Sequence, residues 1–176
     1  MAMSTRPDRS DAAAYYFTYI DQVGDGDVLP ILEEQLASTV SLLEGISEEQ
    51  SQQRYEPGKW SIREVAGHIN DTERLFSFRA LWFARGLDTP LPSFDQDAAM
   101  SHAGSDAQPL ARHTQEFAAI RAGTIALFRN LPAEAWTRRG TASGNPFTVN
   151  ALAYICAGHV AHHVRLLRER YRVGAA

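Results

Sequence analysis

Hydrophobic positions recur every three or four residues through most of the chain, and this spacing predicts long amphipathic helices. Strand signals are weak throughout. The expected helices cover residues 28 to 43 or 44, 62 to 84 or 85, 109 to 130, and 149 to 171. Four such helices in one chain are typical of an all-α four-helix bundle. We therefore expect residues 1–176 to form a single domain.

Local signals mark where these helices begin and end. Pro30 suits an early helical position because its missing N–H costs nothing there. Ser61 and Glu64 form a capping-box pattern, and Thr148 is placed to cap the last helix. Gly86 is expected to end the second helix.

Three segments lie outside the helical pattern. Residues 1–27 hold an aromatic stretch, 12–23, that we expect to form an arm or a short helix before the glycines of 24–27. Residues 87–108 have little periodicity and are expected to form a long loop, a feature often found in lids or binding segments. Residues 137–146 are polar and contain glycine.

The charge balance bears on possible partners. The formal net charge is −4, whereas a nucleic-acid binder usually has a basic excess or a basic face. The one basic cluster ends the last helix, where cations interact favourably with unpaired carbonyls; it comprises Arg165, Arg168, Arg170 and Arg172. We expect no nucleic-acid partner.

The chain also lacks the usual marks of export or membrane insertion. It has no apolar stretch of about 18 residues and no signal-peptide pattern. Its single cysteine, Cys156, fits a reducing compartment. We therefore expect a cytoplasmic protein without membrane association.

The histidines carry the clearest candidate chemistry. His159 and His163 are four residues apart in the last helix, so their side chains share one face and can bind one metal ion. His68, at the edge of the inward face of the second helix, is the best third ligand. His162 competes with His163, since only one of them can face the site and the other should lie beside it or be exposed.

Other readings of these residues are open. Cys156 lies one turn before His159 and is either a soft ligand or a small core residue. His102 and His113 are less suitable ligands. Buried histidines can also be hydrogen-bonded core residues that hold no metal, although two imidazoles in one apolar stripe are costly without a partner.

Two stretches of the chain resemble signatures of the DinB-like superfamily. The first reads WSIREV at 60–65 and GHI at 67–69, followed by Asp71, Glu73 and Arg74. The second reads AGHVAHH at 157–163 and ends in ERY at 169–171. Between them, ARG at 84–86 and FDQD at 94–97 are similar to one subfamily. The likeness runs from about residue 15 to residue 171.

This resemblance implies more than the spacing does. It implies an up-up-down-down four-helix bundle, often a homodimer, with a nickel or zinc ion on three histidines that correspond to His68, His159 and His163. It thus favours His163 over His162. It also implies a metal-dependent hydrolase, or a transferase or isomerase that uses a small thiol such as mycothiol or bacillithiol as cosubstrate.

Three protein ligands leave a coordination position open for a small-molecule substrate. A metal there would activate water or bind a thiolate. Asp71, one turn after His68, is the candidate catalytic residue that accepts from an imidazole N–H, and Glu73 and Asp95 are further candidates. Arg74, Arg79 and Arg85 could bind an acidic substrate, although helix surfaces carry such residues routinely. A non-catalytic metal-binding protein and a stress-related interaction protein are the alternatives.

Overall fold

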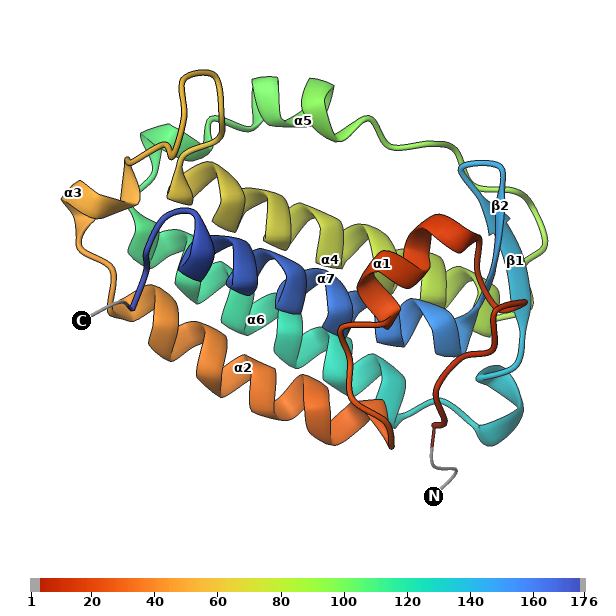
Figure 1. The fold of residues 1–176 in the computed structure, drawn as a ribbon. Coiled ribbons are helices and arrows are strands. Elements are labelled where there is room, and N and C mark those ends of the chain that lie inside the picture. Colours follow the sequence, from red (N-terminus) through yellow and green to blue (C-terminus); the bar gives the residue numbers. More distant parts are fainter. Residues whose placement is uncertain (1–3, 175–176) are drawn as a thin grey trace.

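Four long helices pack side by side in the computed structural model, which describes residues 4–174 (Figure 1). They are α2 (Val28–Glu44), α4 (Ile62–Ala84), α6 (Leu110–Arg129) and α7 (Val149–Glu169). The prediction of an all-α four-helix bundle is confirmed. The limits agree with the sequence pattern to within two residues at each end.

Three of these helices begin at a residue whose side chain caps the first turn. Asp27 accepts from the backbone N–H of Leu29 at the start of α2, and Thr148 accepts from Ala151 at the start of α7. The capping box predicted at Ser61 is present in full. The first N–H of α6 instead donates to a carboxylate from a neighbouring element, Glu48 Oε1, at 2.9 Å.

The four long helices run in two opposite directions, with two helices in each direction. Along the chain, α2 runs one way, α4 and α6 run the other way, and α7 runs parallel to α2 (Figure 1). Around the bundle, α2 contacts α6 and α7, and α4 contacts the same two helices. In chain order the helix directions are therefore up-down-down-up, rather than the up-up-down-down order that the resemblance implied, and the two helices of each direction are adjacent in the bundle. The connection from α4 to α6 must run back along the bundle.

A polar layer crosses the middle of the core and separates two apolar clusters. Its centre is the ion pair of Arg121 on α6 with Glu73 on α4, whose side chains are 0% and 1% exposed. Nε and Nη2 of Arg121 donate to the two carboxylate oxygens at 2.5 and 2.7 Å. Gln35 of α2 accepts from Arg121 and donates to the carbonyl of Ala157 on α7. All four long helices are thus tied together at one level.

Residues 87–108 differ from the structureless loop expected. They contain the eight-residue helix α5 (Gln96–Ala103), capped by Asp95, and a 3₁₀ turn, Ser105–Ala107. Only Met100 of α5 is buried, so this short helix has almost no apolar stripe for a periodicity test to detect. A second short helix, α3 (Glu48–Ser51), lies between α2 and α4.

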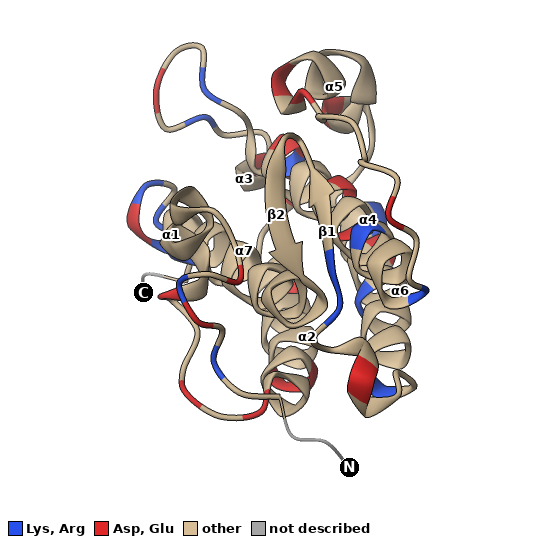
Figure 2. Ribbon diagram, turned by 90° about the vertical axis from the view of Figure 1, so that its right-hand side faces the viewer, with Lys and Arg blue, Asp and Glu red and all other residues tan. Residues whose placement is uncertain are grey.

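The polar stretch before α7 forms a hairpin that the weak strand signals did not predict. Strands β1 (Arg139–Ala142) and β2 (Asn145–Thr148) pair in antiparallel register across a turn at Ser143 and Gly144, which both have positive φ. Leu91 bonds to the hairpin at Thr141 and Ser143, so distant backbone completes the pairing. Figure 2 shows the hairpin standing across one end of the bundle between α1 and α4.

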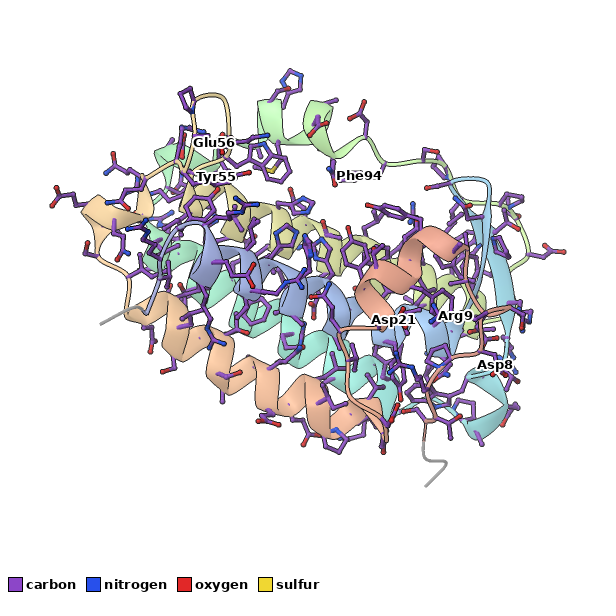
Figure 3. The ribbon with its side chains drawn as sticks, viewed as in Figure 1. Asp8, Arg9, Asp21, Tyr55, Glu56 and Phe94 are labelled. Atoms are coloured by element: carbon purple, nitrogen blue, oxygen red, sulfur yellow. The ribbon has the colours of Figure 1, made fainter. Side chains whose placement is uncertain are left out.

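The N-terminal aromatic stretch folds onto α7. Residues Ala14–Tyr16 form a 3₁₀ turn that continues into α1 (Phe17–Ile20). Arg9 and Asp21, which flank this segment, form an ion pair with N–O distances of 3.1 and 3.2 Å (Figure 3). The backbone of Tyr19 presses on Gly158 so closely that a Cβ there would lie 2.2 Å from the Tyr19 carbonyl oxygen. The glycine before His159 therefore allows α1 to cover this part of α7.

Candidate metal centre

Three imidazole rings from two helices converge inside the bundle. Nε2 of His159 on α7 lies 3.1 Å from Nε2 of His68 on α4 and 3.2 Å from Nε2 of His163 on α7. One ring nitrogen from each residue lies within 4.8 Å of the others. The three residues are 4%, 4% and 8% exposed. The structure therefore brings together the three histidines predicted from the sequence.

This geometry fits a divalent ion. Two nitrogens bound at 2.0–2.1 Å in a tetrahedral site are about 3.3 Å apart, close to the two distances at His159. Hydrogen bonding alone fits less well, because Nε2 of a neutral imidazole has either one proton or one lone pair. His159 Nε2 has two nitrogen neighbours and can form only one good hydrogen bond. A shared cation would use all three lone pairs.

Burial keeps the three rings in the form that binds metal. It lowers the pKa of His68 to about 4, with a smaller contribution from the nearby His162. Burial also holds the pKa values of His159 and His163 well below the ordinary range, and repulsion from the other rings adds to the effect. All three imidazoles are neutral at pH 7, and neutral imidazole is the ligand form.

Neighbouring side chains orient the rings. The Thr72 hydroxyl lies 3.3 Å from Nδ1 of His68, and the Trp60 ring packs on the same imidazole with centroids 4.8 Å apart. The Tyr19 ring meets His159 edge-on at 5.3 Å. Among the described residues, His163 Nδ1 is buried without a hydrogen-bond partner.

Asp71 does not reach the cluster. Its side chain is 40% exposed and lies 3.7 Å from the Arg74 guanidinium, while Thr72 occupies the position beside His68. Asp71 follows His68 by three residues and Thr72 by four, and the one-residue difference turns the carboxylate away from the ring. Residues three and four positions apart both share a helix face in principle, so spacing alone does not show which of the two reaches the ring.

The remaining candidates lie elsewhere. Glu73 forms an ion pair with Arg121, and Asp95 caps α5. Cys156 is fully buried in the apolar cluster, and burial raises the pKa of its thiol. His162 is half-buried, with Nδ1 3.4 Å from the Gln22 amide. His113 lies 2.9 Å from the Ser105 carbonyl, and His102 is exposed on α5.

A cavity of about 220 Å³ reaches the cluster at His159. Its floor comes from α4 and its walls come from the N-terminal aromatic segment, the chain before α5 and the hairpin turn; the residues that line it are Tyr15, Tyr16, Tyr19, Thr72, Leu75, Phe76, Arg79, Phe94, Gln96, Ser143 and His159. Figure 3 shows Phe94 below the chain that leads into α5, on the side of that chain that faces the bundle. The sequence reasoning missed these walls because they lie in segments without periodicity. The only signal for them was the cluster of aromatic residues in 12–23.

Comparison with known proteins agrees with the geometry. The model of the DinB superfamily matches residues 31–167, so the chain belongs to that superfamily. YfiT from Bacillus subtilis has a similar fold at a TM-score of 0.74 and 19% sequence identity, over 98% of this chain and 97% of YfiT. YfiT is described as a probable metal-dependent hydrolase with an unusual four-helix bundle topology. The search of curated proteins gave no match.

One further property of the helices bears on location. Within residues 4–174, no helix combines the length and the apolar character needed to cross a membrane. On the face drawn in Figure 2, acidic and basic residues are interspersed rather than separated by sign.

Proposed function

We propose that this protein is a metal-dependent enzyme whose divalent ion, zinc or nickel, is held by His68, His159 and His163. The observation that carries the proposal is the convergence of three buried Nε2 atoms beside a cavity. Three protein ligands leave room for an exchangeable fourth, which is the pattern of catalytic rather than structural sites. The cavity beside His159 favours an enzyme over a protein that only stores or senses metal.

A bound divalent ion would supply Lewis acidity, lowering the pKa of a water or a small thiol to generate a nucleophile for hydrolysis or group transfer. The chain's own residues would prepare the site for this chemistry. Neutral imidazoles present their lone pairs, and Thr72 sets the ring orientation of His68. Hydrolysis agrees with the description of YfiT, and thiol transfer remains the second possibility for the same site.

The cavity walls would position the substrate and limit access of water. Phe76, Phe94 and the tyrosines of the N-terminal segment supply aromatic surface. Burial and a hydrogen bond with Tyr15 raise the pKa of the Tyr19 hydroxyl, so Tyr19 keeps its proton at Oη and can donate to a substrate oxygen. No carboxylate is among the described lining residues. A catalytic role for Asp71 stays a prediction, as do the homodimer and the cytoplasmic location.

Metal analysis of the purified protein tests this proposal. We expect about one zinc or nickel ion per chain by elemental mass spectrometry after growth with both metals. His159→Ala should lose the ion, whereas His102→Ala, which changes an exposed histidine on α5, should retain it. Equal, near-zero metal in wild type and His159→Ala would instead favour a packed, non-catalytic bundle. A metal-loaded protein that turns over neither ester, amide nor thiol substrates would favour the non-catalytic metal-binding alternative.

A further inference from the structure

Arg79 is buried without an acidic partner. It is 2% exposed, yet among residues 4–174 no carboxylate lies within ion-pair distance of its guanidinium. Its hydrogen bonds both leave from Nη2 and go to neutral acceptors, the Ser143 hydroxyl at 2.8 Å and the Pro92 carbonyl at 3.3 Å. Nε is buried with no partner among the described residues.

The other fully buried arginine shows what compensation requires. Arg121 donates through two nitrogens to both oxygens of Glu73 and also bonds to Gln35. Burying a guanidinium without such a partner is costly. Burial lowers the pKa of Arg79, and the Tyr16 phenol is the only neighbour that opposes this effect. The positive charge of Arg79 is thus left without a negative partner within the described chain.

Arg79 faces the same cavity as the metal-site histidine. It is the only charged residue among those that line the 220 Å³ space, and His159 is on the lining too. The Phe76 ring is 5.9 Å from the Arg79 guanidinium carbon and 6.2 Å from the His159 ring. The guanidinium and the imidazole are therefore no further apart than these two distances together, a span that a small organic molecule can bridge.

We propose that this cavity binds small organic anions, with the carboxylate or phosphate group of the ligand on Arg79 and its apolar body against the aromatic walls. Guanidinium groups are well suited to both anions. The placement of the ligand's other end at His159 rests on the proposed metal-dependent function. The anion preference itself depends only on Arg79 and the cavity, so it can be tested without metal.

Three probes of similar size separate the possibilities: benzoate, phenyl phosphate and the neutral benzamide. Binding is measured by ligand-observed NMR and titration calorimetry on the chelator-treated protein and on the zinc-loaded protein. We expect at least one anion to bind about tenfold more tightly than benzamide in both forms, since a charge-assisted hydrogen bond discriminates by at least that factor. The tighter of the two anions identifies carboxylates or phosphate esters as the ligand class.

Substitutions of Arg79 test its role, and a substitution of Arg85 at the end of α4 is the control. Arg79→Gln should abolish the preference for anions, and Arg79→Lys should retain part of it. Arg85→Gln, which changes an exposed arginine just after α4, should leave the preference intact. Benzamide binding as tightly as both anions, a failure of all three probes to bind, or a preference that survives Arg79→Gln would overturn the inference. If the wild-type protein prefers the anions but takes up neither zinc nor nickel, the metal proposal is refuted and this inference stands.

Discussion

Nε2 of His68 and Nε2 of His159 lie 3.1 Å apart, although 91 positions separate the two residues in the chain. The antiparallel contact of α4 with α7 produces this approach, and both side chains are buried. The same nitrogen of His159 lies 3.2 Å from Nε2 of His163 and can form only one of the two hydrogen bonds, whereas a shared cation would use the lone pairs of all three rings.

Metal should stabilise the fold through these rings. A ligand that binds only the native state raises the free energy of unfolding by about 2.7 kcal/mol at one hundred times its Kd. Zinc or nickel should therefore raise the Tm of the wild-type protein, and the rise should grow with metal concentration. In His68→Gln the shift should be largely lost, because only two ligands remain. An equal shift in His68→Gln and wild type, measured by differential scanning calorimetry, would place the metal elsewhere.

Thr72 should matter more than Asp71 for metal affinity. The Thr72 hydroxyl lies beside Nδ1 of His68, while the Asp71 carboxylate faces Arg74. Loss of a group that orients a ligand typically weakens metal binding about 10- to 100-fold. We expect Thr72→Val to show such a loss in competition titrations with a chromogenic chelator, and Asp71→Asn to bind metal within about threefold of wild type. The reverse order would restore the role predicted for Asp71 from the sequence.

The contrast between Thr72 and Asp71 shows which parts of the site can be predicted from the sequence. The cluster of three histidines was predictable because His159 and His163 share a helix face and the DinB-like motifs extend across both helices. The long helices were predictable because each carries an apolar stripe. Thr72 was not predictable, because a hydroxyl four residues from a histidine is common and carries no chemical signal. The cavity walls could not be predicted either, because the hairpin of β1 and β2 depends on pairing with Leu91 from a distant segment.

The metal-free protein should lose stability as the pH falls below about 6.5. In the folded state the pKa of His68 is about 4, and those of His159 and His163 are also depressed. The unfolded chain takes up protons near the ordinary histidine pKa while the folded chain does not, so acid favours unfolding. Each histidine should contribute about 1 kcal/mol of destabilisation between pH 7.5 and pH 5.5.

Urea denaturation of the chelator-treated protein at these two pH values provides the measurement. The variant with His68, His159 and His163 all replaced by Gln is the control. Acidic groups titrate alike in both proteins, so the difference between their pH dependences isolates the three imidazoles. Identical pH dependence in wild type and variant would show that the rings are not held neutral in the folded state.

The two buried arginines should respond in opposite ways to removal of charge. Arg121→Met leaves Glu73 as an isolated buried carboxylate and should cost about 3–5 kcal/mol of unfolding free energy. Arg79→Met removes a charge that has no acidic partner, so we expect unchanged or higher stability. Chemical denaturation of both variants at pH 7 tests the pair. A large loss in Arg79→Met would mean that its bonds to Ser143 and Pro92 stabilise the fold more than its burial costs.

Gly158 should be required for the contact between α1 and α7. A Cβ at this position would lie 2.2 Å from the Tyr19 carbonyl oxygen, which is backbone and cannot move alone, so Gly158→Ala must push α1 away from His159. We expect a loss of about 1–3 kcal/mol, as for other overpacked sites, together with faster proteolysis within residues 12–23. Gly123→Ala is the matched control, because a Cβ at Gly123 meets nothing within 4 Å on the exposed face of α6. That change should be neutral or stabilise the helix by up to about 1 kcal/mol. If Gly158→Ala is tolerated as well as Gly123→Ala, the N-terminal segment does not pack on α7 as described. In that case Tyr15, Tyr16 and Tyr19 do not form a wall of the cavity.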